Sequence, residues 1–323
     1  MNRISIALCT FNGSKYLREQ LDSFVSQERQ PDEIIICDER SSDQTIEIVN
    51  AFIKKAPFDV KLVINNNNLG VTKNFEKAIR LCTGDLIALS DQDDIWHPQK
   101  IKLHEKLFDN RSDIGITFSN AEVVDQMLNP LGYNMWHRID FTLNEQQKVL
   151  NGEAVSVFLK HFIVTGATMI FKADLKPIIL PIPSCWFHDA WIALMIASIS
   201  NVSFIREPLI KYRQHSNNQL GGIQKRLTRQ IIEVFNTNRA DYYGIETRRY
   251  GLALDRLKDI SDKFEVSENI YLLNEKVKHL KLRASMSRNR FFRIPAVLKE
   301  ILRLGYYRYS RNWGSVAMDL LFK

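Results

Sequence analysis

Apolar residues along the first hundred or so positions of this 323-residue chain follow two alternating patterns. Short apolar runs, each with the length of a buried strand, occupy 3–9, 33–37, 59–64 and 85–90. Between these runs, apolar residues recur at the spacing of a helix that buries one face. Strands that alternate with helices through short turns predict a parallel α/β sheet with right-handed crossovers. The turns that follow the strands then share one edge of the sheet.

Beyond this region the pattern is less regular. Further strands are predicted at 114–118, 122–125 and 164–171. The intervening residues 126–150 are polar, and we expect them to form an irregular insertion. From Gln224 onward the pattern is helical, without a strand-like run of consequence. The chain is therefore expected to hold two domains, one at 1–221 and a helical region at 222–323.

The formal net charge of +7 is concentrated in the helical region. Residues 222–323 hold 21 lysines and arginines against 11 acidic residues, a net charge of +10. Residues 1–221 hold 23 against 26, a net charge of −3. Basic surfaces attract anions, so the candidate partners of this region are nucleic acid, anionic lipid or a phosphorylated substrate.

A basic amphipathic helix is predicted near the C-terminus. Its apolar stripe has helical spacing and consists of Ile294, Val297, Leu298, Ile301 and Leu302. The basic residues that surround the stripe are Arg290, Arg293, Lys299 and Arg303. This combination is typical of a helix at the surface of an anionic membrane. It equally suits a helix that packs against the first domain or against a second copy of the chain.

The cysteines and the apolar runs bear on the cellular setting. The four cysteines are scattered at Cys9, Cys37, Cys82 and Cys185. They lack the spacing of a metal site or a disulfide framework, which predicts reduced thiols in the cytosol. No apolar run approaches 18 residues, so we expect no transmembrane helix. The first residues lead directly into a strand pattern, so we expect no signal peptide.

Polar residues gather in the turns after three of the predicted strands, at Thr10–Asn12, Asp38–Asp43 and Asp91–Asp94. The last turn carries three carboxylates, which repel one another unless a cation joins them. Such oxygen ligands suit Mg²⁺ or Mn²⁺, although an acidic turn that caps the next helix would have the same sequence. Three polar turns on one edge favour a site for a nucleotide with its phosphates and metal. The dinucleotide and P-loop motifs are both missing from the sequence.

Four motifs, in this order, resemble those of family 2 glycosyltransferases with the GT-A fold. They are Thr10-Phe11-Asn12, Cys37 to Asp43, Asn68 to Phe75, and Ser90-Asp91-Gln92-Asp93-Asp94-Ile95-Trp96. The Asp-Gln-Asp-Asp-x-Trp form is most similar to the rhamnosyltransferase-like bacterial branch of that family. The resemblance covers roughly residues 3–220. It implies a Rossmann-like mixed α/β sheet flanked by helices, with a helical C-terminal extension.

The resemblance also implies a reaction and its residues. The reaction is the metal-dependent, inverting transfer of a sugar from a nucleotide-diphosphate donor to an acceptor hydroxyl, with Asp189 as the general base. The implied donor contacts are Thr10, Asn12, Asp38, Glu39, Lys73, Asn74, Asp91, Gln92 and Arg213. The implied ligands of Mg²⁺ or Mn²⁺ are Asp91, Asp93 and His215. The implied acceptor contacts are Trp96, Gly166, His188 and Trp191.

Several of these residues also have simpler interpretations. Asp189 lies in the first turn of a predicted helix, where the helix dipole stabilises any carboxylate. In the simpler interpretation of His215, it is an ordinary hydrogen-bonded histidine. In that of Gly166, the glycine marks a bulge in a core strand. Glu39 and Arg40 replace the Asp-Gly that is usual in the family. Whether Glu39 contacts the nucleobase or the ribose of the donor is therefore left open. Arg40 would either contact a phosphate or be solvated.

The resemblance extends to partners and location. It implies a surface polysaccharide or lipid-linked glycan as acceptor, and a cytoplasmic protein at the inner face of the membrane. The first candidate donor is dTDP-rhamnose, and a UDP-hexose is the next. Two rival functions are a nucleotidyltransferase that makes the activated sugar and a non-catalytic subunit that binds a glycan or nucleotide. Nucleic-acid binding rests on charge alone, and we do not expect it.

Overall fold

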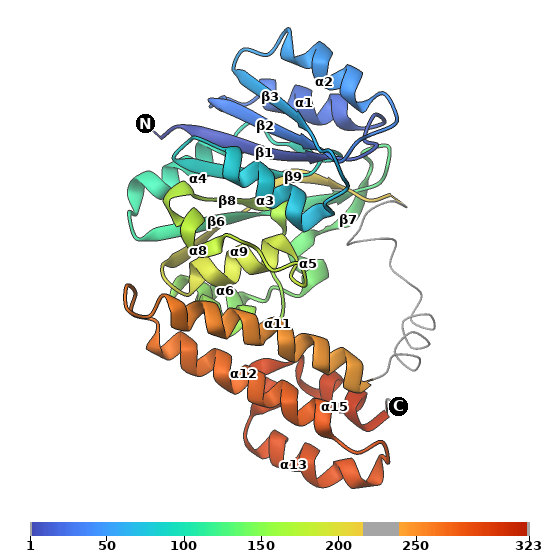
Figure 1. Ribbon diagram of the computed structural model, residues 1–323, viewed down its shortest axis with the longest axis vertical. Coiled ribbons are helices and arrows are strands. Elements are labelled where there is room, and N and C mark those ends of the chain that lie inside the picture. Colours follow the sequence, from blue (N-terminus) through green and yellow to red (C-terminus); the bar gives the residue numbers. More distant parts are fainter. Residues whose placement is uncertain (1, 216–238, 322–323) are drawn as a thin grey trace. The chain divides into compact units, whose positions relative to one another are not determined.

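The computed structural model describes residues 2–215 and 239–321, which belong to two compact units (Figure 1). The unit that carries the glycosyltransferase-like motifs, which we call the catalytic unit, comprises Met1–Gly152 and Ile163–His215. The helical unit comprises Glu153–Phe162 and Ser216–Lys323. The predicted boundary at residue 221 lies outside the described residues. The short segment at 153–162 belongs to the helical unit, although its sequence falls within the predicted first domain.

Four parallel strands form the first half of the sheet in the catalytic unit. They are β1 (Ile4–Thr10), β2 (Glu33–Asp38), β3 (Asp59–Ile64) and β4 (Leu86–Ser90), in the spatial order β3-β2-β1-β4. The register pairs Thr10 with Asp38 and Leu8 with Ser90, so β1, β2 and β4 end side by side. The strands, their parallel pairing and their shared edge confirm the prediction for this half.

The second half of the sheet is mixed, as the family resemblance implied. Its strands are β5 (Ile95–Trp96), β6 (Ile114–Val124), β7 (Pro130–Asn134), β8 (Met169–Lys172) and β9 (Asn201–Arg213). Strand β8 lies between β4 and β6 and is antiparallel to both, whereas β9 is parallel to β6. The parallel pairing that strand-helix alternation predicted for the first four strands ends at β4, and the mixed sheet that the resemblance implied is confirmed. Because β8 is antiparallel to β4, the segment that precedes β8 lies at the edge where β4 ends, whereas the segment that follows β8 lies at the opposite edge.

Residues 126–150 are ordered elements rather than the predicted irregular insertion. They contain β7, α5 (Met135–Ile139) and α6 (Leu143–Leu150). Helix α6 begins with a capping box in which Thr142 and Glu145 bond reciprocally. Trp136 and Phe141 pack edge to face. The strands predicted at 114–118 and 122–125 are one strand, β6, whose bulged register preserves its pairing with β9.

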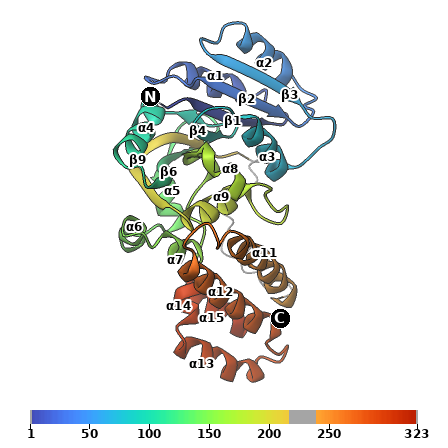
Figure 2. The same cartoon turned by 60° about the vertical axis from the view of Figure 1, so that its left-hand side comes forward.

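Helices cover both faces of the sheet (Figure 2). One face carries α1 (Leu17–Val25), α2 (Thr45–Ile53) and α4 (Lys100–Asn110), whose apolar residues join one core cluster. The other carries α3 (Val71–Leu81), α8 (Lys176–Ile179) and α9 (His188–Ala197). Helix α9 is buried along its whole length, with Asp189 as its one residue outside the buried set. The N-terminus of α9 thus brings a carboxylate to the polar edge of the sheet.

The helical unit is built from α-helices and one 3₁₀ turn in the residues that the structure describes. They are α7 (Ala154–Phe158), α11 (Arg239–Asp259), α12 (Ser267–Ser285), η3 (Phe291–Arg293), α13 (Ile294–Leu302), α14 (Gly305–Tyr309) and α15 (Asn312–Leu321). Helices α11 and α12 pack side by side (Figure 1). In the described ranges, every helix is too short or too polar to cross a bilayer.

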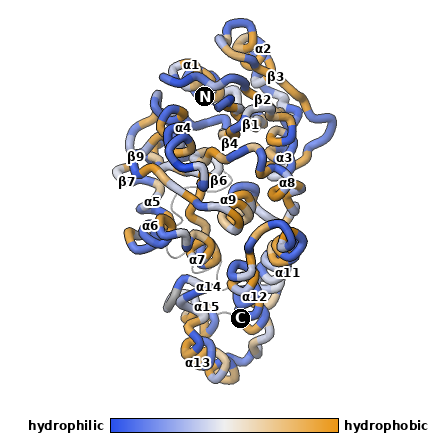
Figure 3. Tube along the Cα trace, turned by 90° about the vertical axis from the view of Figure 1, so that its left-hand side faces the viewer, coloured by the Kyte–Doolittle hydropathy of each residue, from blue (hydrophilic) through white to orange (hydrophobic). Residues whose placement is uncertain are grey.

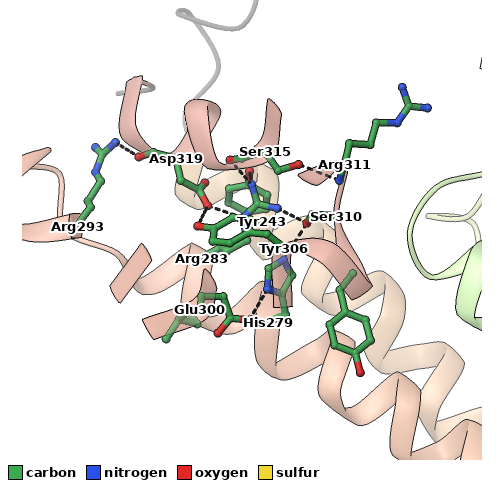
Figure 4. A network of polar contacts seen from close by, with 12 residues as sticks. Tyr243, His279, Arg283, Arg293, Glu300, Tyr306, Ser310, Arg311, Ser315 and Asp319 are labelled. Atoms are coloured by element: carbon green, nitrogen blue, oxygen red, sulfur yellow. Dashed lines mark hydrogen bonds and ion pairs between the residues drawn. The ribbon is translucent and has the colours of Figure 1, made fainter. Parts of the chain in front are cut away.

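Buried polar residues connect the helices of this unit (Figure 4). Arg283 of α12 donates from Nε to Asp319 Oδ2 at 2.6 Å, and the Tyr306 hydroxyl donates to the same oxygen at 2.6 Å. His279 Nδ1 lies 2.6 Å from Glu300 Oε1. Because a buried charge is costly unless it is paired, these contacts fix how α12, α13, α14 and α15 pack.

Candidate active site

The turns after β1 and β2 are cross-linked at the sheet edge. Thr10 Oγ1 donates to Asp38 Oδ2 at 2.7 Å. The backbone N–H of Asn12 donates to Ser41 Oγ at 2.8 Å, and Asn12 Oδ1 accepts from the Ser42 N–H at 2.8 Å. Asn12 has a φ of 46° and Arg40 a φ of 61°, a left-handed conformation that costs a residue with a side chain roughly 1 kcal/mol or more. The two turns are held in a shape that the free backbone would avoid, which is common at functional sites.

Gln92 links these turns to the acidic turn after β4. Its Oε1 accepts from the Phe11 N–H at 2.9 Å, and its Nε2 donates to the Phe11 carbonyl at 3.0 Å. A Cβ atom at Gly13 would lie 2.1 Å from Gln92 Oε1, so a side chain there would displace Gln92 from these bonds. All three predicted polar turns therefore meet, and Gln92 is a bridge within the protein as well as a predicted donor contact.

The acidic turn crowds negative charge at the end of β4. Burial, followed by the charges of Asp93 and Asp189, raises the pKa of Asp91 to about 7. Burial and the charges of Asp93 and Asp91 also raise the pKa of Asp94 well above its usual value. Asp94 Oδ1 accepts from the Arg213 N–H at 3.1 Å, while its Oδ2 has no hydrogen-bond partner among the described residues. The turn is electrostatically unfavourable without a cation.

The end of strand β9 and the residues just after it place two basic side chains beside this turn. His215 Nε2 lies 2.7 Å from Asp93 Oδ2, and the His215 ring stacks on Tyr16 with centroids 5.0 Å apart. Arg213 donates from Nε to the Asp93 carbonyl at 2.8 Å and pairs with Glu19. The structure therefore brings His215 to Asp93, as the predicted metal site requires. Tyr16 was missed because its position at the start of a helix carries no signal of chemistry.

Asp189 faces the acidic turn from the N-terminus of α9. Its Oδ2 accepts from the Gly166 N–H at 3.2 Å, and its Oδ1 accepts from the Ala190 N–H at 2.7 Å. Its charge contributes to the raised pKa of Asp91, which places the two carboxylates close together. Gly166 lets the segment before β8 approach, since a Cβ atom there would lie 2.9 Å from His188 Nε2. The residue proposed as base and the residues proposed to hold metal thus belong to one site.

The neighbouring His188 is buried against an aromatic ring. It stacks on Phe75 with centroids 3.9 Å apart, and burial lowers its pKa, so the imidazole is neutral. Its Nε2 has no hydrogen-bond partner within the described part of the chain. At 9% exposure, His188 keeps a small accessible surface beside Asp189. A contact between His188 and an acceptor stays a prediction.

Five of the predicted donor contacts lie beneath the surface of the site. They are Thr10, Asp38, Glu39, Asn74 and Arg213, all at most 5% exposed. Glu39 accepts from the Leu69 and Gly70 N–H groups, and Asn74 Nδ2 donates to the Cys37 carbonyl. In this structure these side chains hold the backbone of the turns in place. Direct contact between them and a donor stays a prediction.

Three other predicted contacts are also displaced from the site surface. Trp96 and Trp191 are each 1% exposed; Trp96 packs on Phe24, and Trp191 Nε1 donates to the Ile179 carbonyl. Contact between either tryptophan and the acceptor stays a prediction. Lys73 Nζ donates to Glu76 and to the Ile182 carbonyl, which engages it at the flank of α3 rather than at the turns.

The residues present fit a divalent cation that also takes ligands from a diphosphate. Asp91 and Asp93 supply carboxylate oxygens, and His215 supplies an imidazole nitrogen next to Asp93. In the ranges that the structure describes, these groups do not form a closed cluster of three protein ligands. Mg²⁺ and Mn²⁺ in transferase sites typically use one or two carboxylates and complete their shell with phosphate oxygens and water. The orphaned Asp94 oxygen and the raised pKa of Asp91 are consistent with a missing positive charge.

The mixed sheet, the carboxylate turn after β4 and the opposing carboxylate on α9 define the class of nucleotide-sugar transferases with the GT-A fold. The chain belongs to glycosyl transferase family 2, whose family model matches residues 5–172. A dTDP-rhamnosyl transferase of Shigella flexneri, RfbG, is 30% identical over 223 residues, which cover 66% of this chain and 73% of that protein. An uncharacterized protein of Mycobacterium tuberculosis is 24% identical over 226 residues, and the match spans 59% of that relative's length.

Solved structures show the same fold. Residues 1–349 of TarS from S. aureus, in complex with UDP-GlcNAc, superpose with a TM-score of 0.56 at 16% identity, covering 99% of this chain and 89% of that one. A mannosyltransferase of Pyrobaculum calidifontis, in complex with GDP-Man and Mn²⁺, has a TM-score of 0.52 at 16% identity and covers 93% and 75%. These similarities confirm the GT-A fold that the sequence motifs implied.

Proposed function

We propose that the protein transfers a sugar from a nucleotide-diphosphate donor to a hydroxyl of a bacterial surface polysaccharide or lipid-linked glycan, with inversion at the anomeric carbon. The observation that supports this most directly is the convergence of two carboxylate groups of different kinds. Asp91 and Asp93 crowd at the end of β4, and Asp189 faces them from α9. A cation with the donor diphosphate would pair with Asp91 and Asp93, and the acceptor hydroxyl would bind Asp189.

Asp189 is proposed to remove the proton from the attacking hydroxyl. The hydroxyl oxygen forms a bond to the anomeric carbon, the bond from that carbon to the diphosphate oxygen breaks, and the proton passes to the Asp189 carboxylate. The N–H groups of Gly166 and Ala190 hold this carboxylate in place. A positioned general base contributes roughly 10²–10⁴-fold in rate. The neutral His188 beside it would orient the acceptor.

Asp91, Asp93 and His215 are proposed to hold Mg²⁺ or Mn²⁺. When bound, the ion supplies Lewis-acid stabilisation of the diphosphate as negative charge develops on it. Arg213 helps to fix the position of Asp93 by donating a hydrogen bond to its carbonyl. The turns at 10–12 and 38–43 form the neighbouring part of the sheet edge, where we place the nucleoside. There Asn12 is exposed and Gln92 is half-buried, so both retain surface for a donor.

For the donor we propose dTDP-rhamnose first and a UDP-hexose second. The relative from Shigella flexneri is described as a dTDP-rhamnosyl transferase, and two structural neighbours were solved with UDP-GlcNAc or GDP-Man. The neighbour with GDP-Man also contains Mn²⁺, which supports the proposed metal dependence. We place the reaction in the cytoplasm, with the protein peripheral to the inner face of the membrane.

A thermal-shift panel of nucleotide sugars, each with and without Mn²⁺, tests the donor site. A ligand at 100 times its Kd stabilises the folded state by about 2.7 kcal/mol, so a correct donor gives a clear increase in melting temperature. We expect one nucleotide sugar to shift the transition only with metal, and to release its nucleoside diphosphate when a lipid-linked acceptor is added. Pyrophosphate release from a nucleoside triphosphate and a sugar phosphate would instead identify a nucleotidyltransferase. No donor binding under any condition would contradict the proposal.

A further inference from the structure

One helix of the helical unit exposes large apolar side chains on its outer side. The set is Phe291, Phe292, Ile294, Leu298 and Leu302, with exposures of 80%, 74%, 43%, 55% and 84%. We call these residues the η3–α13 face. Ile294, Leu298 and Leu302 are four residues apart, so they form one line along α13, and Phe291 extends it at i−3. Hydrophobic and hydrophilic positions alternate along this helix (Figure 3).

The inner side of α13 already packs in the unit's own core. Val297 is 2% exposed and belongs to a cluster with Met286, Tyr306 and Val316. The predicted stripe therefore splits, because Val297 faces inward whereas Leu298 and Leu302 face outward. Folding of the unit accounts for the inner line of apolar residues. It does not account for the outer line.

Charge around the face has a single sign. Residues 286–318 contain seven lysines and arginines and one acidic residue, Glu300. Glu300 is 6% exposed and bonded to His279, so it contributes little negative charge to the surface. Arg288, Arg290, Lys299 and Arg303 are exposed beside the apolar line. The surface around the apolar line is thus cationic.

The segment that carries Phe291 and Phe292 is held in place by a buried arginine. Arg293, which was predicted to border the stripe, is 0% exposed. Its guanidinium donates to the Arg288 carbonyl at 2.8 Å. It also donates to the Asp319 carbonyl at 2.8 Å (Figure 4). The prediction for Arg293 is therefore corrected, because its charge is used inside the unit. Its effect is to fix the positions of Arg288 and Phe291 relative to α13.

We propose that the η3–α13 face docks on the surface of an anionic phospholipid bilayer. The apolar line would enter the boundary between headgroups and acyl chains, while the four exposed basic residues contact lipid phosphates. This proposal rests on the peripheral-membrane part of the proposed function and assigns it to particular residues. A symmetric contact between two copies would bring their cationic rims together, which is unfavourable. Nucleic acid would use the charges and leave the apolar line exposed to water.

Co-sedimentation of the full chain with phospholipid vesicles tests the proposal. At physiological salt we expect binding to vesicles that contain roughly a third phosphatidylglycerol, and at least tenfold weaker binding to pure phosphatidylcholine. The variant Phe291→Ser/Phe292→Ser should bind at least tenfold more weakly, since it removes two interfacial aromatic rings. The variant Arg288→Ala/Arg290→Ala should lose about 25-fold, because each basic residue near an anionic surface is worth about fivefold.

Matched controls come from the catalytic unit. Leu143→Ser removes an apolar side chain that is 75% exposed, and Lys54→Ala/Lys55→Ala removes two exposed lysines. Both should bind vesicles like the unchanged protein. Equal binding by all variants would overturn the proposal, as would equal binding to neutral and anionic vesicles. Conversion of a dimer to a monomer by Phe291→Ser/Phe292→Ser, with unchanged vesicle binding, would assign the face to a second copy instead.

Transfer to a soluble acceptor separates this proposal from the proposed function. The Phe291 and Arg288 double variants should retain that transfer, because their residues belong to the helical unit. Loss of vesicle binding with retained transfer supports both proposals. Vesicle binding by a chain that binds no donor and transfers no sugar would support the docking face and contradict the proposed function.

Discussion

In the catalytic unit, Asp94 is buried and Asp91 is half-buried, and among the described residues no basic side chain is bonded to either carboxylate. In the helical unit, Asp319 accepts from Arg283 and Glu300 is bonded to His279. Burial raises the pKa of both carboxyls in the first unit, whereas His279 lowers the pKa of Glu300 in the second. Carboxylates thus lack a bonded basic partner in the catalytic unit and have one in the helical unit.

We interpret this difference as one between residues that serve ligand binding and residues that serve folding. A paired buried carboxylate stabilises its unit relative to the same structure with one partner removed. Crowded carboxylates without a cation destabilise the unit that holds them, so their presence needs a ligand as its explanation. Substitution in the catalytic unit should therefore cost activity and spare stability, and substitution in the helical unit should do the reverse.

The largest expected effect is on catalysis, at Asp189. The variant Asp189→Asn should lower kcat by roughly 10²–10⁴-fold, or about 3–5 kcal/mol of activation free energy, because the amide accepts no proton. The single side-chain oxygen of asparagine can accept from the Gly166 N–H but not also from the Ala190 N–H, so the melting temperature should fall only slightly. Steady-state kinetics and calorimetric titration of the donor measure the two quantities. A parallel loss of donor affinity would show that Asp189 binds the donor instead.

The second effect is on stability, at the paired carboxylate Asp319. Asp319→Asn leaves the buried Arg283 guanidinium without its counter-charge, and we expect the unfolding free energy of the helical unit to fall by about 3 kcal/mol. Transfer to a soluble acceptor should persist below the melting temperature. Urea unfolding followed by circular dichroism measures the loss, with the exposed Asp262→Asn as the control. A stability equal to that of the control would remove the distinction between the two units.

Local sequence signals located most of the sheet edge in advance. A buried strand followed by a polar turn predicted that Thr10, Asp38 and Asp91 would meet, because parallel strands end together. The burial of individual side chains could not be predicted in the same way. Trp96 and Arg213 adjoin catalytic-looking motifs, but their burial depends on the pairing of β5 with β9, more than a hundred residues later in the chain.

The errors beyond β4 have a similar origin. Short apolar runs at 114–118 and 122–125 were predicted as separate strands because a bulge interrupts the pattern, although β6 is continuous. The elements within 126–150 are five to eight residues long, too short for periodicity to be visible. Gln92 carried a signal as part of the acidic motif. Its bonds to the Phe11 backbone could not be read from that motif.

A third, smaller effect concerns the stability of the metal-free catalytic unit. The folded-state pKa of Asp91 is about 7 against an ordinary value of 3.8. Its contribution to stability is therefore greatest below about pH 4 and is lost as pH rises through about 7. In a chelator, Asp91→Asn should be more stable than the unchanged protein at about pH 8, by on the order of 1–2 kcal/mol, and nearly equal at about pH 4.

Urea unfolding across this pH range checks the sign of the effect. Mn²⁺ should stabilise the unchanged protein at about pH 8 and have a much smaller effect on Asp91→Asn, because metal binding needs the deprotonated carboxylate. The exposed Asp22→Asn provides a control outside the site. If the unchanged protein and Asp91→Asn have the same pH dependence, the crowding at this turn does not destabilise the unit.

The smallest expected effect concerns Arg40, an exposed cation on the same edge. It replaces the glycine usual in the family and adopts a φ of 61°, with Nη1 3.2 Å from the Asn66 carbonyl. Arg40→Gly relieves a left-handed conformation worth roughly 1 kcal/mol but adds a similar entropy to the unfolded chain. The net change in unfolding free energy should be below about 0.5 kcal/mol. Any larger consequence of the substitution must therefore come through the donor.

Two variants separate the backbone effect of Arg40 from its charge. Arg40→Ala removes the guanidinium and keeps the strained Cβ, whereas Arg40→Gly removes both. If the guanidinium contacts the donor, both variants should raise the KM for the donor by about threefold to tenfold with little change in kcat, since one exposed charge-assisted contact is worth about 1 kcal/mol. Unchanged KM in both would identify Arg40 as a solvated residue. A rise in Arg40→Gly alone would show that the left-handed turn is what the donor requires.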